Sequence, residues 1–408
     1  MQERKVDLKY IYFLFFLYLF VFSDWLAIYF PIVSNWDEIF ALIAVPIWII
    51  NFTQNGFKIS IARGGYGIWV FGYLFFSAIS NVVSQNQTII PILSDLLVNL
   101  KFWFSIYIGY HYFGKMNQET SDYKISAHIK FIVVVFIILA AVDRIHPIFE
   151  SDVRYGIRVL KLFYSIHTVF ASVCAVLLSI LYITAKRGRT LSIYCVLLLL
   201  LMCATLRSKA FGGALLFIII VFWFQYKKEK MKIWQIILLG LMGLFVGWSQ
   251  IQFYFFSSIS DGAARAVLLR NTINLVKDYF PFGVGFAGYG SYFSGVYYSK
   301  IYQKYSLANI YGLTQNHPVF VADSFWPMVF GQAGILGGAC FVIALIKLFK
   351  KTQSVVKAKT SIAIVATYIL AQLTINSMAE SSFTNALVVG YGCILGICFA
   401  RGENYEFN

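Results

Sequence analysis

Charged residues are scarce in this chain of 408 residues, because Asp, Glu, Lys and Arg together make up only 12% of it. A typical soluble domain has about a quarter charged residues and about 45–50% apolar ones. Here the apolar share is 60%, with 40 Phe and 27 Tyr, and the mean hydropathy is +0.73. A globular core of this size cannot bury so much apolar surface. The composition therefore excludes most soluble enzyme folds and predicts a polytopic membrane protein.

Cysteine and histidine are also few, with six and five residues. The cysteines all fall within runs that we predict to span a membrane, namely Cys174, Cys195, Cys203, Cys340, Cys393 and Cys398. Buried thiols in such runs act as small hydrophobic side chains, so we expect no disulfides. No two histidines have the spacing of metal ligands, and no carboxylate cluster indicates a divalent-cation site. We therefore predict a site with neither a metal nor a cofactor.

What the sequence has instead is long apolar runs. A membrane-spanning helix needs about 20 mostly apolar residues. Twelve such runs lie near 10–30, 39–54, 65–84, 96–113, 125–143, 161–184, 190–206, 210–226, 233–256, 325–346, 361–377 and 383–400. We predict an all-α polytopic membrane protein with twelve transmembrane helices, which form one integral membrane domain over residues 1–408. One connection, at 257–324, is much longer than the others.

The distribution of positive charge predicts how these helices are oriented. If the N-terminus is cytoplasmic, the cytoplasmic segments hold 21 of the 33 Lys and Arg residues but only seven of the 18 acidic ones. Cytoplasmic loops of membrane proteins are enriched in Lys and Arg, so we predict that both termini are cytoplasmic and that 257–324 is extracytoplasmic. The net charge of +15 then reflects the orientation of the helices in the membrane. We expect membrane lipids, and no nucleic acid, among the partners.

The long loop is the first candidate for function, because long loops on a rigid scaffold usually carry binding or catalytic residues. Residues 261–280 have the apolar spacing of an amphipathic helix that Pro281 ends. The glycines at 283, 285 and 288 match a dinucleotide-binding pattern, but no strand precedes them and no acidic residue follows, so we reject that function. We expect them to allow tight turns or the close approach of a ligand. Tyr289 and Tyr298 add aromatic faces and hydroxyls, which suit sugars.

Extracytoplasmic cations are the second candidate, because positive charge on that side opposes the orientation rule. Guanidinium groups pair with phosphate oxygens and stay charged, so we expect a multiply charged anion at the outer surface of the membrane. Contact with lipid phosphates or with solvent is the alternative. A helix through Arg154, Arg158 and Lys161 would place all three on one face, since they are spaced i, i+4 and i+7. The other such cations are Arg207 and Lys209 in a tight turn, and Arg265 and Arg270 in the loop helix.

Two residues are candidates for a general base. His317, in the run Gln315-Asn316-His317-Pro318, belongs to a residue type that titrates near neutral pH; a surface-loop histidine without a role is the alternative. Asp323 lies at the outer end of the tenth apolar run, where it either faces a cavity or caps a helix. The carboxylates show no paired arrangement of the glycosidase kind.

Several short motifs between Arg207 and Gly338 together resemble those of a known family. Its members typically have an arginine just after a span, as in Leu206-Arg207-Ser208-Lys209, and a second arginine about eleven residues before a turn like Pro281-Phe282-Gly283-Val284-Gly285, as Arg270 is here. The run Asp323-Ser324-Phe325-Trp326-Pro327, with Gly331-Gln332 and Gly334 after it, is also similar. On these residues the chain resembles the O-antigen and exopolysaccharide polymerase (Wzy-type) family and, more distantly, the O-antigen ligases. Ligases usually pair the late loop histidine with Asn or a second His, whereas His317 is followed by Pro318, which favours the polymerase.

The resemblance implies a helical bundle like that of the membrane-embedded C-type glycosyltransferases (GT-C), with residues 257–324 as a lid over the site. It implies an enzyme that transfers undecaprenyl-pyrophosphate-linked glycan onto another lipid-linked repeat unit, without a metal, at the outer face of the bacterial plasma (inner) membrane. A chain-length regulator protein is a further partner that it implies. In this reading Arg207, Arg270 and Arg265 stabilise the pyrophosphate leaving group, His317 or Asp323 accepts the proton, and Arg154, Arg158, Lys209, Tyr289 and Tyr298 contact substrate. The alternatives are a ligase that uses lipid A–core as acceptor, a lipid-linked oligosaccharide flippase or other transporter, and a structural membrane subunit.

Overall fold

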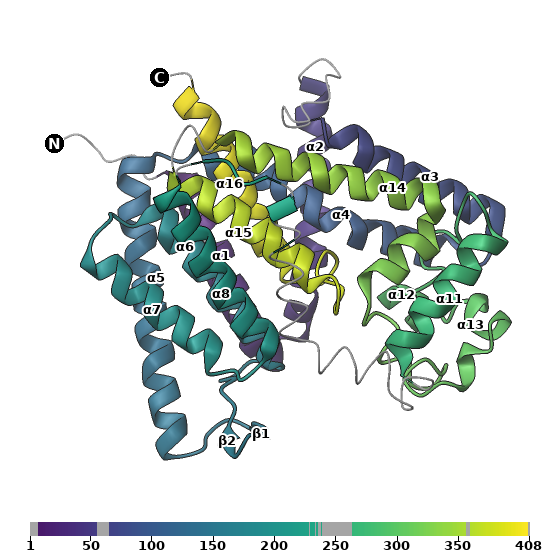
Figure 1. The fold of residues 1–408 in the computed structure, drawn as a ribbon, viewed down its shortest axis with the longest axis horizontal. Coiled ribbons are helices and arrows are strands. Elements are labelled where there is room, and N and C mark those ends of the chain that lie inside the picture. Colours follow the sequence, from purple (N-terminus) through teal and green to yellow (C-terminus); the bar gives the residue numbers. More distant parts are fainter. Residues whose placement is uncertain are drawn as a thin grey trace.

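The computed structural model describes residues 7–54, 65–227, 229–232, 234, 235, 238, 263–355 and 360–406. These residues are predominantly helical (Figure 1). Up to residue 226 the elements are α1 (Leu8–Tyr29), the 3₁₀ helix η1 (Pro31–Asn35), α2 (Trp36–Gln54), α3 (Gly67–Ser84), α4 (Ile89–His111), η2 (Phe113–Lys115), α5 (Gln118–Ile145), the strands β1 (Val153–Arg154) and β2 (Ile157–Arg158), α6 (His167–Thr184), α7 (Arg189–Cys203) and α8 (Ser208–Tyr226). After residue 263 they are α11 (Ala264–Asp278), α12 (Tyr292–Val296), α13 (Lys300–Lys304), η4 (Leu307–Asn309), α14 (Phe325–Ser354), α15 (Thr360–Asn376) and α16 (Val388–Glu406).

The predicted all-α polytopic class is confirmed. Within the described residues, eight helical stretches are long and apolar enough to cross a membrane, and α7 and α15 are apolar but shorter. The last predicted span, near 383–400, corresponds to most of α16. The span predicted at 233–256 falls almost wholly outside the described residues. The total of twelve spans therefore stays a prediction.

The two ends of the described chain lie at one end of the helical bundle. Asp7, which caps α1, accepts a hydrogen bond from the N–H of Asn117 just before α5 (3.3 Å). Near the other terminus, Arg401 in α16 forms an ion pair with Asp122 in α5 (2.6 Å). We call this end of the bundle the termini face, and the other end, where α6 and α8 begin, the opposite face. That the termini face is cytoplasmic stays a prediction.

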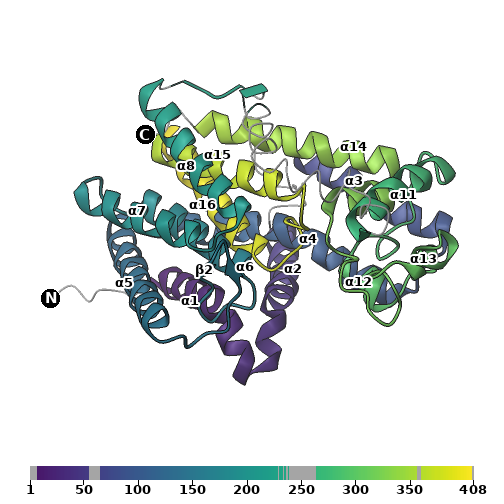
Figure 2. The ribbon, with the colours of Figure 1, turned by 60° about the horizontal axis from the view of Figure 1, so that its bottom comes forward.

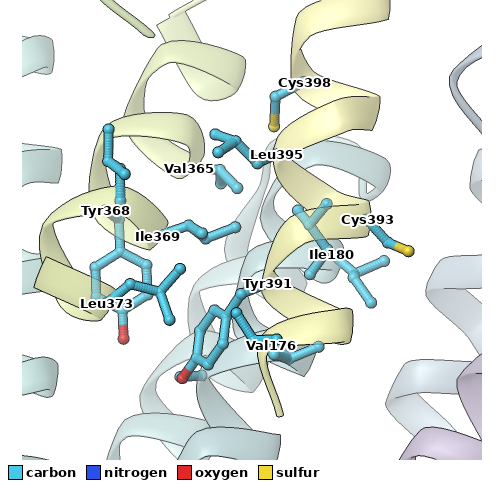
Figure 3. Close-up of a cluster of buried hydrophobic side chains, with 14 of the residues drawn as sticks. Val176, Ile180, Val365, Tyr368, Ile369, Leu373, Tyr391, Cys393, Leu395 and Cys398 are labelled. Atoms are coloured by element: carbon cyan, nitrogen blue, oxygen red, sulfur yellow. The ribbon is translucent and has the colours of Figure 1, made fainter. Parts of the chain in front are cut away.

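The centre of the bundle is built on close contacts between α4 and α16. A Cβ atom on Gly109 of α4 would lie 2.1 Å from the carbonyl oxygen of Cys393, and one on Gly396 of α16 would lie 2.2 Å from that of Ile106. Small residues let helices in membranes approach this closely. Buried side chains of α6, α15 and α16 then fill the space between those three helices (Figure 3), among them Val176, Ile180, Val365, Tyr368, Ile369, Leu373, Tyr391 and Leu395.

Residues 263–324 form a separately packed unit, which we call the loop module. Its helices α11, α12 and α13 surround an apolar core of their own that includes Leu268, Leu275, Val284, Tyr289, Ile301, Tyr302 and Leu313. Figures 1 and 2 show the module beside one end of α3 and α14, away from α5 and α7. The amphipathic helix predicted over 261–280 is confirmed as α11 for the residues that are described.

The helix that would have placed Arg154, Arg158 and Lys161 on one face is not formed. Strands β1 and β2 form a two-stranded antiparallel hairpin instead, in which Val153 pairs with Arg158. The two residues between the strands, Tyr155 and Gly156, have φ of 52° and 73°, the backbone of a tight hairpin turn. Because side chains alternate along a strand, the two arginines lie on opposite sides of the hairpin. Helix α6 accordingly begins only at His167, and not near residue 161.

Candidate functional site

The glycine-rich segment that follows α11 is buried against α14. The backbone N–H groups of Val284 and Gly285 donate hydrogen bonds to the carbonyl oxygens of Gly331 and Gln332, both at 2.9 Å. Helix α14 is kinked at Gly334 (φ 66°, ψ −165°), and a kink leaves the carbonyls before it without their usual helical donors. Two of the motifs that carried the family resemblance therefore bind each other. The close approach that we expected of the glycines is made to the protein's own backbone.

Side chains of α3 and α4 hold the same segment from the other side. Asn81 accepts a hydrogen bond from the N–H of Phe286 (2.8 Å) and donates one to its carbonyl oxygen (3.0 Å). Asp95 Oδ2 accepts hydrogen bonds from the N–H of Ala287 (2.6 Å) and from Gln332 Nε2 (2.8 Å). Asp95 is completely buried. These bonds anchor the segment that follows α11, and with it the loop module, to the membrane bundle.

At the opposite face, three residues from separate parts of the chain meet; we call them the Arg207 cluster. Arg207 is the N-cap residue of α8, and its Nη2 lies 3.0 Å from Nδ1 of His167, the first residue of α6. Asp152 Oδ2 lies 3.6 Å from Arg207 Nη2 and also 3.6 Å from His167 Nε2. The cluster thus contains a guanidinium, an imidazole and one carboxylate.

The hydrogen bond from Arg207 determines which nitrogen of His167 carries the proton. A guanidinium can only donate, so Nδ1 is the acceptor and the neutral ring has its hydrogen on Nε2. That Nε2 is buried and makes no hydrogen bond in the described structure, since the Asp152 oxygen is 3.6 Å away. The Asp152 side chain is 63% exposed, whereas that of His167 is only 6% exposed. Two donors therefore converge on a position that an exposed carboxylate occupies, and this geometry suits a phosphate group.

Of the other cations in this part of the chain, Arg154 and Lys161 lie near the Arg207 cluster, whereas Arg158 stabilises the hairpin. Arg154 and Lys161 lie close enough to His167 to act on it electrostatically, so they add positive potential at the cluster. Arg158 points elsewhere, because its Nη1 binds the side chain (3.0 Å) and the carbonyl oxygen (2.8 Å) of Asp143. Its Nη2 donates to the carbonyl oxygen of Phe149. Arg158 therefore holds the base of the hairpin.

A second ion pair lies where the loop module meets α14. Arg265 Nη2 is 2.9 Å from Asp323 Oδ2, and both side chains are partly exposed. The residue that caps α14 is Ser324, so Asp323 is not the helix cap that was one of its two expected roles. Arg270 lies five residues further along α11, which is about 140° around the helix at 100° per residue, and it is exposed. It therefore points to a different side of α11 from Arg265.

The turn between α15 and α16, residues 377–387, connects the two charged groups. Glu380 forms an ion pair with Lys209, two residues after Arg207 on α8 (2.9 Å). The next residue, Ser381, donates a hydrogen bond to the carbonyl oxygen of Ala322, next to Asp323. We call residues 377–387 the bridging turn. Its contacts form a continuous path from α8 to the loop module.

His317 lies on the surface of the loop module. Its backbone N–H donates to the carbonyl oxygen of Thr314 (3.1 Å) and its ring packs 5.5 Å from that of Tyr311. The side chain is exposed. The structure therefore places His317 where a substrate can reach it, and its role as a base stays a prediction.

The two tyrosines predicted to contact substrate are engaged inside the loop module. Tyr289 is fully buried and its hydroxyl donates to the carbonyl oxygen of Leu268 (2.7 Å). Tyr298 is partly buried and donates to that of Leu313 (2.9 Å). Burial raises the pKa of both phenols above its usual value, so both remain donors. In this conformation Tyr289 belongs to the module's core and offers no face to a ligand.

Sequence reasoning missed His167 and Asp152. They lie 40 and 55 residues before Arg207, and only the packing of α6 beside α8 brings the three together. One signal was present in the sequence, because His167 lies within the apolar run 161–184, close behind Arg154, Arg158 and Lys161.

No protein-family model matches this chain, and no curated protein matches it either. The site is therefore assigned from its own geometry and chemistry, and the resemblance to the polymerase family depends on the short motifs given above.

Proposed function

We propose that this chain is a glycosyltransferase of the polysaccharide-polymerase kind, which adds an undecaprenyl-pyrophosphate-linked glycan to a second lipid-linked repeat unit. The observation that supports the proposal best is the Arg207 cluster, in which a guanidinium and a buried imidazole N–H converge beside an exposed carboxylate. The proposal takes the opposite face to be the outer surface of a bacterial plasma membrane, with the long loop as a lid over the site.

In the proposed reaction, a hydroxyl of the acceptor sugar attacks the anomeric carbon of the donor sugar. The new glycosidic bond forms as the bond to the pyrophosphate oxygen breaks, and the hydroxyl proton passes to a base. Negative charge develops on the departing undecaprenyl pyrophosphate, and preorganised donors that face such charge lower the barrier. Arg207 and the Nε2–H of His167 supply these donors, and Arg270 is the second arginine that the family resemblance assigns to the leaving group.

Asp323 and His317 are the two candidate bases in this proposal. One carboxylate oxygen of Asp323 is already bound to Arg265 (2.9 Å). His317 is exposed, and its described contacts include no carboxylate or guanidinium, and histidine is the residue type that most often serves as a general base. We therefore propose that His317 accepts the proton of the acceptor hydroxyl. Substituting each residue separately tests this assignment.

A transporter is the alternative from another functional class, because ionisable residues inside spanning helices often mark a transport path. Lys101 and Asp37 are 3% and 5% exposed, and Asp95 is fully buried. Each of them holds part of the fold, since Lys101 pairs with Asp37 and Asp95 binds the loop module. These contacts favour structural roles, so glycosyl transfer remains the better supported function.

The test uses purified protein and a lipid-pyrophosphate-linked repeat unit, in EDTA and with no other acceptor. Products are separated by size for the wild type, Arg207→Ala, Arg270→Ala and a control, Arg144→Ala, which removes an exposed arginine from the end of α5. We expect a ladder of longer glycans from the wild type and from the control. Loss of one leaving-group donor costs about 10²–10³ in rate, so Arg207→Ala and Arg270→Ala should give almost none.

Other outcomes have distinct meanings. Transfer only after lipid A–core is supplied would make the chain a ligase. A ladder that appears only with a divalent metal would refute the metal-independent mechanism. A ladder that survives both substitutions would keep the polymerase and remove the two arginines from the site.

A further inference from the structure

A large cavity opens at the termini face, at the end of the bundle away from the Arg207 cluster. It lies among α5, α6, α7 and α8 and has a volume of about 1050 Å³. Ligand sites of small molecules usually have volumes of about 300–1,000 Å³, so this cavity is slightly larger than most of them. The cavity contacts the last residues of α6, whereas His167 is the first residue of that helix. The two ends of α6 are about 25 Å apart at 1.5 Å per residue. The cavity therefore belongs to a different site.

The inner part of the cavity is apolar. Its walls include Val196 and Leu199 on α7, and Ile218 and Phe222 on α8. Along α7 it extends from Thr190 to Leu199, which is about 14 Å at 1.5 Å per residue. The hydrocarbon core of a bilayer is about 30 Å thick, so the cavity extends along α7 for about the depth of one leaflet. This depth matches the acyl chains of a membrane lipid.

The mouth of the cavity is cationic. Lys186 and Arg187, in the connection between α6 and α7, line it here, and Lys130 lines the cavity from within α5, with its Nζ 5.9 Å from the centre of the Tyr194 ring. Among the described residues that line the cavity, Asp122 is the one acid. Asp122 is already neutralised, because both of its oxygens bind Arg401, at 2.6 and 3.1 Å. The cavity therefore offers a ligand three cations, two of which lie between α6 and α7, at the end of the bundle where lipid headgroups lie.

We propose that this cavity is a binding site for an anionic phospholipid. The lipid phosphate lies against Lys130, Lys186 and Arg187, and the acyl chains lie along α7 and α8. Basic pockets between membrane helices recognise anionic headgroups in this way. A zwitterionic lipid carries its own cation, which the three basic side chains repel, so the cavity selects for net negative charge.

The experiment uses the full-length purified protein in nanodiscs of phosphatidylcholine that contain increasing amounts of phosphatidylglycerol. Bound lipids are counted by native mass spectrometry after release from the nanodiscs. The test variant carries Lys130→Gln, Lys186→Gln and Arg187→Gln. The control variant removes the same charge from the same end of the protein through Arg189→Gln, Lys347→Gln and Lys350→Gln, none of which lines the cavity. A third variant, Val196→Trp, blocks the apolar wall without changing charge.

We expect the wild type and the control to retain one phosphatidylglycerol, with saturable binding. Each cation near a membrane surface contributes about 1 kcal/mol to the binding of anionic lipid, so the test variant should bind about a hundred-fold more weakly. Val196→Trp should also lose the lipid. Equal retention by the test and control variants, or equal binding of phosphatidylcholine, would overturn the proposal. Displacement of phosphatidylglycerol by equimolar undecaprenyl phosphate would overturn the choice of phospholipid, and a protein dimer that covers the cavity would replace the lipid with a second copy of the chain.

Discussion

Arg207 and His167, 40 positions apart in the sequence, lie with Nη2 of the one 3.0 Å from Nδ1 of the other. Arg207 is the N-cap of α8 and His167 is the first residue of α6, so two helix N-termini meet at this point. A helix N-terminus carries a partial positive charge and unpaired N–H groups. Both helices and both side chains therefore favour an anion at the same place. This agreement between backbone and side chains is the strongest argument for a phosphate site.

Replacing His167 by Ala should weaken the binding of pyrophosphate. The substitution removes the buried Nε2–H, and hydrogen bonds to charged groups contribute about 1.5–3 kcal/mol, which corresponds to a loss of about 10- to 150-fold in affinity. Isothermal titration of the purified protein with inorganic pyrophosphate measures it. His146→Ala is the matched control, because His146 is an exposed histidine just after α5. Equal affinities for the two variants would exclude His167 from the site.

Replacing Asp152 by Asn should have the reverse effect and strengthen pyrophosphate binding. The Asp152 carboxylate is 3.6 Å from both donors, so an incoming anion must displace it. Because this side chain is 63% exposed, its ion pairs are worth no more than about 1 kcal/mol, and the gain should be up to about five-fold. Glu150→Gln removes the same charge from an exposed position two residues earlier and should leave the affinity unchanged. Weaker binding by Asp152→Asn would show that the carboxylate organises the site.

The spacing of apolar and charged residues predicted most helices well, and it failed where the chain makes a tight turn. The apolar spacing of 261–280 and Pro281 predicted α11 closely. The i, i+4, i+7 spacing of the hairpin cations was misleading, since Gly156 next to Tyr155 permits the positive φ of a tight turn. A glycine in the middle of a predicted helix was therefore the signal to weigh more heavily.

The functional contacts were only half predictable, because they join residues that are distant in the sequence. Arg207 was recognisable as a cation on the side that we predicted to be extracytoplasmic, where cations are unexpected. Its partners were not, since nothing local marks Asp152 as the carboxylate that reaches it. Tyr289 shows the converse error, because an aromatic residue in a long loop was expected to face a ligand and instead fills the module's core.

Replacing Gly285 by Ala should strongly destabilise the protein. Gly285 has φ of +81°, and a Cβ atom there would lie 2.3 Å from the side chain of Asn81, so the substitution both strains the backbone and separates the loop module from α3. We expect a fall of several degrees in the melting temperature of the detergent-solubilised protein. Gly212→Ala, in α8, has nothing within 4 Å of the added Cβ and should be neutral or stabilising by up to about 1 kcal/mol. A Gly285→Ala protein as stable as wild type would show that the segment does not dock tightly.

The buried pair of Lys101 and Asp37 should stabilise the protein only as a pair. Lys101 Nζ donates to Asp37 Oδ2 between α4 and α2, with the residues 3% and 5% exposed. Removing one partner leaves an uncompensated buried charge, which costs about 3–5 kcal/mol, whereas removing both is often close to neutral. Lys101→Met and Asp37→Asn should therefore each lower the melting temperature, and the double variant should recover much of the loss. The partly exposed pair of Lys209 and Glu380 is the comparison, and its coupling should be no more than about 1 kcal/mol. If the double variant instead shows the sum of the two single losses, each residue stabilises the bundle through other contacts, and the ion pair itself has no part in holding α2 against α4.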